Sequence, residues 1–461
     1  MDRSTKATLA IAGMLALAAA VQVYAFHWGV ITPDTVEQYG QALSGRYDDW
    51  HPPVTAWLWH LILRVSSGTA GILLFDVALY WAGIGCLAAS AFRRWGSGFA
   101  GLTIVVGLLP IPFGQMGSIL KDPLLTALCL FASGVMVLEP PRMVQLFAAV
   151  LLAVATATRF NALFATLPLL IGAAPCMFFA SRARGVATVM AGALLLAGSS
   201  WLINVAWLHP HRSEPIFSLV NFDLGGIAAH GGGNPYPSMT DDETRQMTRA
   251  CYDVRLYNSR DTQPCEQVED RLVAYAHRYG VSAISIWLHG IASAPIAYAV
   301  HRISHLNWNW RLFVPNVPDD AVYVMSEPNL YGLVFRSNWV TRVVLASARV
   351  MAWSPFGRPA TWIVVAFCLL LIAAPLPSRK PIRMLAASSL CYGGAYAAVS
   401  VASDLRYNLW TMVAAMVASV FALGDIRAGA RLERRPAFVA LGILLAAFGI
   451  EIAGFIVGGK I

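Results

Sequence analysis

Long apolar segments constrain the fold of this chain more than any other feature. Eleven such segments occur, and only two of them contain a charged residue, Asp76 and Glu451. A bilayer core requires about 20 apolar residues per helix, and only 13% of all residues are charged, against about 25% in soluble domains. We therefore predict an all-α polytopic membrane protein with about 11 transmembrane helices. The expected spans are 7–26, 70–92, 99–113, 123–138, 144–158, 160–180, 186–208, 360–376, 384–402, 407–423 and 437–457.

Basic residues between these segments predict the orientation. Apart from the block 209–358, most Lys and Arg residues lie in every second connection between the expected spans. Such clusters normally remain in the cytoplasm. We expect a multi-pass protein of the inner or plasma membrane with a cytoplasmic N-terminus and a retained first span. The clusters comprise Arg3, Lys6, Arg93, Arg94, Arg142, Arg182, Arg184, Arg379, Lys380, Arg383, Arg427, Arg431, Arg434 and Arg435.

The block 209–358 between the seventh and eighth expected spans is long and polar. The parity of the spans places it outside the cytoplasm, so we expect an exported, mainly helical domain between two membrane bundles, 1–208 and 359–461. Within it, 281–300 and 343–353 are apolar enough to span a membrane. We favour a pair of interfacial helices there, with thirteen spans as the alternative.

Two local patterns within this block predict a helix and a disulfide. Thr240 and Glu243 have the spacing of a capping box and predict a helix that runs from there towards Tyr257. Cys251 and Cys265 are the two of seven cysteines that lie outside the apolar segments. Because disulfides persist in exported domains, we expect these two cysteines to form one.

The first outer connection carries the densest group of ionisable residues: Asp34, Glu37, Asp48, Asp49 and His51. Asp34 follows a proline directly after the first span, and Glu37 lies one helical turn later on the same side. Such a carboxylate can serve as a general base at the membrane surface. It can also simply cap a helix, because aspartate is a common N-cap residue.

Three further outer connections repeat this pattern. Lys121 and Asp122 precede the fourth span, Arg159 follows the fifth, and Asp404 and Arg406 precede the tenth. Taken alone, each of these cations is typical of a long side chain at a helix end whose charged group extends to the membrane surface. Four outer corners with such residues nonetheless indicate a shared binding site for an anionic ligand.

These features together resemble the GT-C class of integral membrane glycosyltransferases, which includes protein O-mannosyltransferases and lipid A aminoarabinose transferases. The resemblance rests on the acidic first loop with Asp34, the Lys121–Asp122 loop, the His51-Pro-Pro stretch and the architecture of many spans with one large insertion. It implies a sugar donor carried on polyprenyl phosphate and matches Asp34 to the catalytic acid of the class. The Trp-Trp-Asp signature of oligosaccharyltransferases is missing, so a divalent metal stays open as a cofactor and no metal ligand is predicted.

We thus expect a glycosyltransferase whose Asp34 takes the proton of the acceptor hydroxyl. Lys121, Arg159 and Arg406 are expected to bind the phosphate of the donor. A polytopic transporter or lipid flippase is the alternative, although such proteins usually show repeated halves and ionisable groups at mid-membrane. The acceptor, a glycan, lipid or protein, is not specified, and no nucleic-acid partner is expected. The residues expected to orient sugar or acceptor are Glu37, Asp48, Asp49, His51, Asp122 and Asp404.

Overall fold

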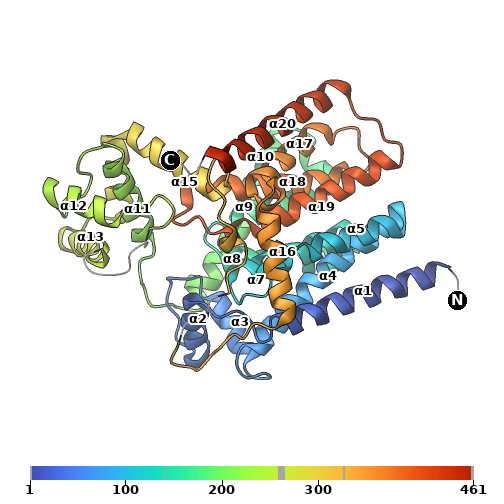
Figure 1. Cartoon of the computed structure of the whole chain (residues 1–461), viewed down its shortest axis with the longest axis horizontal. Helices are drawn as coiled ribbons and strands as arrows, with labels where there is room; N and C mark the ends of the chain where they lie inside the picture. Colours follow the sequence, from blue (N-terminus) through green and yellow to red (C-terminus); the bar gives the residue numbers. More distant parts are fainter. Residues whose placement is uncertain (1–2, 140, 258–264, 325, 327, 458–461) are drawn as a thin grey trace.

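The computed structural model describes residues 3–139, 141–257, 265–324, 326 and 328–457. These residues are almost entirely helical, at 74% helix, and form three isolated bridges but no strand. Figure 1 shows long helices side by side, with a group of shorter ones at one end. The helices are α1 (Arg3–Ala25), α2 (Pro33–Ser44), α3 (Val54–Ile62), α4 (Ala70–Trp95), α5 (Ser97–Leu108), α6 (Pro110–Gln115), α7 (Lys121–Val137), α8 (Arg142–Thr158), α9 (Leu163–Ala173), η1 (Cys176–Phe179), α10 (Arg182–Trp201), η2 (Leu202–Trp207), α11 (Ile216–Ala229), α12 (Asp241–Cys251), α13 (Glu266–Tyr279), α14 (Ala283–Ser293), α15 (Pro295–Trp310), η3 (Pro318–Ala321), α16 (Trp339–Ala352), η4 (Pro355–Gly357), α17 (Pro359–Ile372), α18 (Arg379–Val399), η5 (Leu405–Asn408), α19 (Leu409–Arg427) and α20 (Arg434–Val457).

Each expected span contains a helix, but the helices differ in length. In the described part of the chain, five are long and apolar enough to cross a bilayer: Thr5–Ala25, Ala70–Trp95, Arg182–Trp207, Leu405–Arg427 and Arg434–Val457. The bent pair α14 and α15 makes a sixth if it counts as one span. The chain is therefore a multi-pass membrane protein, and the total of eleven spans remains a prediction.

Helices from both ends of the chain share one hydrophobic core. α18 packs against α9, and α19 packs against α5 and α7, so that 1–208 and 359–461 are joined by direct helix contacts. Small residues allow the closest approach within this core. At Gly83 of α4, a Cβ atom would lie 2.7 Å from the backbone carbonyl carbon of Leu130 in α7, as expected where membrane helices associate through glycine.

Different segments of the chain lie at the two ends of the helix bundle. At one end, an Arg94 guanidinium nitrogen donates to the Ser378 hydroxyl at 3.2 Å, and the Ser378 backbone N–H donates to the Asp425 carboxylate at 2.6 Å. These residues adjoin connections that the sequence places in the cytoplasm. At the other end lie α2, α3 and the group α11–α13, on the left of Figure 1. Connections predicted to lie on one side of the membrane thus meet at one end of the bundle.

The group α11–α14 has a hydrophobic core of its own. Its buried residues include Phe217, Val220, Leu224 and Leu272. The two apolar segments within the block have different neighbours: α14 and α15 pack against α11 and bend by 105° where they meet, whereas α16 packs against α6 and η3. The two segments therefore pack mainly against different helices, and their position relative to the membrane stays a prediction.

A buried polar network joins this group to the bundle. The fully buried Asp223 carboxylate accepts from the Trp287 indole at 2.6 Å, lies 3.0 Å from a ring nitrogen of His301 and pairs with Arg302 at 2.6 Å. Arg302 also donates to the backbone carbonyl of Ser400 at 2.7 Å. Since Ser400 belongs to the connection that leads to Arg406, this network fixes the group α11–α15 beside the site described next.

Candidate functional site

The first helix outside the membrane bundle carries Asp34. Thr32 is the N-cap of α2, and its hydroxyl accepts from the Thr35 backbone N–H while the Thr35 hydroxyl accepts from the Thr32 backbone N–H. Pro33 occupies the first helical position, which its fixed φ favours. Gly45, at φ 65°, ends the helix in a left-handed conformation. Because Thr32 performs the capping, the Asp34 carboxylate is not needed for it.

Asp34 instead faces a cluster of charged side chains from distant parts of the sequence. Its carboxylate lies 3.5 Å from an Arg406 guanidinium nitrogen and 3.8 Å from Nε2 of His51. Nε2 of His51 also lies 3.7 Å from the Glu37 carboxylate. The Lys121 ammonium is 2.6 Å from Nδ1 of the same ring.

The lysine determines the protonation of His51. Burial lowers the pKa of Lys121 to about 7. In its ammonium form Lys121 donates and does not accept, so Nδ1 of His51 is then the acceptor and the proton of the neutral ring sits on Nε2. Burial and the neighbouring Lys121 charge lower the pKa of His51 to about 3, which agrees with a neutral ring. The Nε2–H group of His51 is then near the two carboxylates, but at 3.7 and 3.8 Å it does not form a hydrogen bond to either of them.

The pKa values of the Asp34 and Glu37 carboxylates are shifted in opposite directions. Burial raises the pKa of Asp34, but the positive charges of Arg406 and Lys121 outweigh it and lower the value to about 2. For Glu37, burial and the negative charges of Asp48 and Asp34 raise the pKa to about 7. Near neutral pH, Asp34 is thus ionised while Glu37 is close to its midpoint.

Arg159 reaches the cluster from the break between α8 and α9. It has an extended backbone there, with φ −146° and ψ 147°, and its guanidinium forms an ion pair with the buried carboxylate of Asp122. The guanidinium also lies over the Tyr407 ring, 4.5 Å from the centroid. The ion pair with Asp122 and the contact with the Tyr407 ring hold Arg159 in one orientation. Asn161, two residues later, has a buried amide nitrogen without a hydrogen-bond partner within the described structure.

The cluster opens into a cavity of about 560 Å³. Both ionisable and apolar side chains line it, and the apolar Phe160 and Phe164 are 70% and 45% exposed. The residues that line it are Asp34, Trp50, His51, Pro52, Lys121, Arg159, Phe160, Asn161, Phe164, Pro215, Ile216, Ser218, Leu219, Leu256, Tyr257, Tyr396, Val399, Ser400, Val401, Ala402, Asp404, Arg406 and Tyr407. We call this space the cationic cavity.

The remaining predicted residues hold other positions. Asp404 lies at the cationic cavity and accepts from Arg406 at 2.9 Å. Asp48 and Asp49 are not brought into it. The Asp48 carboxylate accepts from the Gln41 amide at 2.7 Å, and Asp49 accepts from a backbone N–H of the 209–213 connection. Their partners indicate that they fasten the first outer connection and do not touch a ligand in this cavity.

Sequence reasoning did not single out several residues of the cationic cavity. Tyr396 lies in an expected span, where a tyrosine is ordinary, and its hydroxyl donates to the Tyr407 backbone carbonyl at 2.7 Å. Tyr257 is placed by the pairing of its backbone N–H with the Val401 carbonyl at 2.9 Å. Neither residue carries a local signal, because both depend on which distant segments meet.

A divalent metal does not fit these residues. No group of three or more His, Cys, Asp or Glu side chains in the described residues is arranged to hold a metal ion. Asp34, Glu37 and His51 come nearest to one another, but Lys121 occupies one nitrogen of the ring and Arg406 lies against Asp34. A bound cation would have to displace both, so no step of the chemistry is assigned to a metal.

Comparison with known proteins adds a structural similarity. Neither a protein-family model nor a curated protein sequence matches the chain. Among solved structures, the chain is similar to the crystal structure of ArnT from Cupriavidus metallidurans bound to undecaprenyl phosphate, with 12% identity and a TM-score of 0.32 over 91% of this chain and 78% of that one. That structure is of a GT-C aminoarabinose transferase, the class that the sequence resembles. A TM-score this low carries no weight for the activity, which rests on the site.

Proposed function

We propose that this protein is a membrane glycosyltransferase of the GT-C type, which transfers a sugar from a polyprenyl-phosphate donor to an acceptor on the extracytoplasmic face. One observation carries the proposal. Lys121, Arg159 and Arg406, from three separate helix ends, line the same cavity as the Asp34 carboxylate. A cavity with several fixed cations and one carboxylate combines anion binding with proton transfer.

The three cations suit a phosphate group. Lys121 is bonded to His51, Arg159 to Asp122 and Arg406 to Asp404. Their partners hold the side chains in place before a ligand arrives, and such preorganised donors stabilise developing charge without further rearrangement. Phosphate is also an anion that arginine recognises through paired hydrogen bonds.

The apolar lining residues of the cationic cavity suit the prenyl chain. Phe160, Phe164, Ile216 and Val399 line it and are at least 37% exposed. A lipid phosphate requires a charged head-group site next to an apolar surface, and burial of each CH2 group contributes about 0.8 kcal/mol. The side chains of this cavity supply both.

In the proposed reaction, an acceptor hydroxyl oxygen forms a bond to the anomeric carbon of the sugar. The bond between that carbon and the phosphate oxygen breaks, and its electron pair leaves on the phosphate, whose growing charge the cations stabilise. Asp34 takes the hydroxyl proton. Its pKa of about 2 in the free site reflects nearby cations, and a bound anionic phosphate offsets those charges and raises the basicity of the carboxylate.

The proposal is tested by the lipids that accompany the protein. After mild purification, mass spectrometry of extracted lipids should find polyprenyl phosphate or its sugar adduct with the wild type. The amount should fall strongly for the variant with Lys121→Ala, Arg159→Ala and Arg406→Ala. Arg245→Ala is a matched control, because Arg245 is a 64% exposed cation of α12. Absence of the lipid from the wild type, or equal amounts in the triple variant, would refute the proposal.

A further inference from the structure

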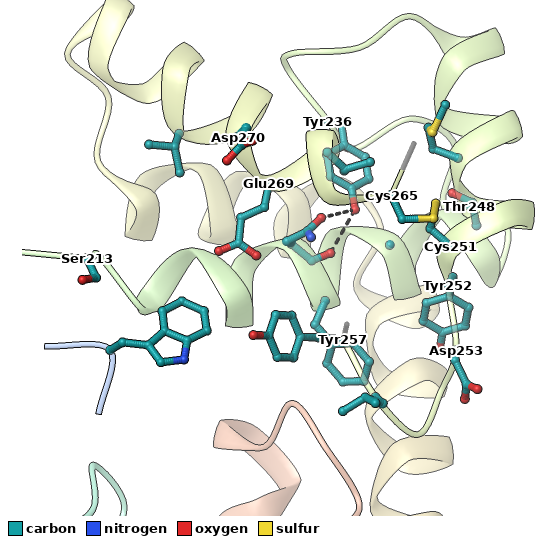
Figure 2. Close-up of a pocket in the computed structure, with 18 residues that line it drawn as sticks. Ser213, Tyr236, Thr248, Cys251, Tyr252, Asp253, Tyr257, Cys265, Glu269 and Asp270 are labelled. Carbon is teal, nitrogen blue, oxygen red and sulfur yellow. Dashed lines mark hydrogen bonds between the residues drawn. A yellow bond between two sulfur atoms is a disulfide. The ribbon is translucent and has the colours of Figure 1, made fainter. Parts of the chain in front are cut away.

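A second cavity, of about 390 Å³, lies between α11, α12 and α13 (Figure 2). Aromatic rings, hydroxyl and amide groups and carboxylates line most of it. We call it the acidic cavity. Its lining residues are Trp50, Ser213, Asn221, Phe222, Gly225, Tyr236, Met247, Thr248, Cys251, Tyr252, Asp253, Leu256, Tyr257, Cys265, Val268, Glu269, Asp270 and Val273.

The two cavities are neighbours. Trp50, Leu256 and Tyr257 line both of them. Trp50 directly precedes His51 in the first outer connection, and its ring lies 6.3 Å from that of Tyr257. A ligand in the acidic cavity therefore comes within one side-chain layer of the cluster around Asp34.

The charges of the two cavities are opposite. The acidic cavity is lined by Asp253, Glu269 and Asp270, and no Lys or Arg is among its described lining residues. Asp253 is paired with Arg255 at 2.7 Å. In Figure 2, the Glu269 carboxylate and the Tyr257 hydroxyl lie on the same side of the cavity, away from Asp253. The carboxylates in this lining favour a neutral or positively charged group over an anionic one.

Several polar groups of the acidic cavity are held in fixed orientations. The Tyr236 hydroxyl donates to the carbonyl and side-chain oxygens of Asn221, both at 2.9 Å. The Tyr252 hydroxyl lies 2.8 Å from Nδ1 of His301, whose other ring nitrogen faces the buried Asp223. Such restraints keep aromatic faces and hydrogen-bonding edges in place, as in a preformed small-molecule site.

We propose that the acidic cavity binds the acceptor, and that the acceptor there is a sugar ring without negative charge. Flat aromatic faces cover the apolar C–H faces of a sugar ring, while carboxylate and amide oxygens accept hydrogen bonds from its hydroxyls. This assignment rests on the proposed function. It places the attacking hydroxyl at the boundary by Trp50 and Tyr257, where it would reach Asp34.

Ligand-observed NMR on the full-length protein in lipid nanodiscs tests the assignment. The probes are methyl glucoside, glucosamine and glucuronate, which are neutral, cationic and anionic sugars of the same size. The neutral and cationic probes should show saturation transfer, and glucuronate should bind at least about fivefold more weakly, as expected when charge repulsion replaces a hydrogen bond.

Two variants locate the binding. Glu269→Gln keeps the shape of the side chain and should weaken glucosamine binding by about fivefold. Asp242→Asn, at a 92% exposed carboxylate of α12, is the matched control and should leave it unchanged. Equal binding of all three probes, no binding of any, or equal effects of the two variants would overturn the assignment.

The same samples separate this assignment from the proposed function. Polyprenyl phosphate should bind to Glu269→Gln as to the wild type, because Glu269 does not line the cationic cavity. If the sugar probes fail while the lipid binds, the acceptor assignment is wrong and the proposed function stands. If the lipid fails to bind to the wild type, the proposed function is wrong whatever the sugars do.

Discussion

The cationic and acidic cavities share one wall but are built differently. Lys121, Arg159 and Arg406 come from three helix ends far apart in the sequence. The carboxylates of Glu269 and Asp270 are adjacent on α13, within a group of helices that has its own small core. The cations of the first cavity therefore depend on the topology of the whole bundle, whereas the carboxylates of the second come from one local group.

This difference separates the two substrates of the proposed reaction. The task of holding a lipid phosphate is assigned to partly buried cations fixed by the membrane bundle. The choice of acceptor is assigned to a group that can change without rearranging the bundle. Perturbations of one cavity should consequently leave binding in the other intact.

Removal of the proposed base should give the largest effect. Asp34→Asn keeps the size of the side chain but removes the carboxylate, so sugar transfer should fall by about 10²- to 10⁴-fold. Polyprenyl phosphate should still bind, because the three cations remain. The measurement is sugar transfer from a polyprenyl-phosphate donor in nanodiscs. Since Thr32 caps α2, near-normal transfer would remove Asp34 from the reaction and leave Glu37 as the candidate base.

Loss of the disulfide should act on the acidic cavity alone. Cys251 and Cys265 are joined and both line that cavity. Opening a loop of this size should cost about 2 to 4 kcal/mol of local stability. Hydrogen exchange should show faster opening of α12 and α13 after reduction, with the wild type under oxidising conditions as reference. An equal loss of polyprenyl phosphate binding would contradict the independence of the two cavities.

Each cation of the cationic cavity should contribute separately to donor binding. Arg159→Ala should weaken binding of polyprenyl phosphate by about 1.5 to 3 kcal/mol, the contribution of a charge-assisted hydrogen bond. It also leaves Asp122 buried without its partner. The double variant Arg159→Ala and Asp122→Asn should therefore recover thermal stability but not lipid binding. Recovery of both would mean that Arg159 serves only the fold.

The pH dependence of donor binding should be the smallest effect. Burial and neighbouring carboxylates raise the pKa of Glu37 to about 7, and a bound anion raises it further, so binding is accompanied by proton uptake. Affinity should fall as the pH rises through about 7, when Glu37 gains a negative charge. Repulsion from one added charge near the bound anion should weaken binding by roughly 1 kcal/mol, or about fivefold.

Glu37→Gln provides the control for this pH dependence, because it keeps the shape and cannot ionise. Its affinity should stay near the value of the wild type at low pH and fall less steeply between pH 6 and 8. The remaining fall belongs to Lys121, whose pKa burial lowers to about 7. A pH dependence as steep as that of the wild type would assign the titration to Lys121 and not to Glu37.

Local sequence signals predicted much of the scaffold. The Thr240–Glu243 spacing correctly marks the start of α12, although the helix ends at Cys251, earlier than the expected run towards Tyr257. The polar outer corners also predicted that Lys121 and Arg406 would lie near Asp34. Charged groups beside apolar helices leave a clear pattern, because a bilayer tolerates them only at its surface or in a shared site.

Pairing between distant segments could not be read from the sequence in this way. In the sequence, Asp48 is as good a candidate for a site residue as Asp34. In the structure, the Asp48 carboxylate instead accepts a hydrogen bond from the Gln41 amide. The role of Tyr257 depends on the contact of its backbone with Val401. Such roles are decided by tertiary contacts, which no periodicity or spacing within one segment reports.

Direct titration with two lipids tests the central claim that the cationic cavity recognises a lipid phosphate. The wild type in nanodiscs is titrated with polyprenyl phosphate and with the uncharged polyprenol of the same length. The phosphate should bind at least about 100-fold more tightly, since three fixed cations contribute. The variant with Lys121→Ala, Arg159→Ala and Arg406→Ala should bind both lipids alike, and Arg245→Ala should behave as the wild type. Equal affinities of the wild type for the two lipids would contradict the account.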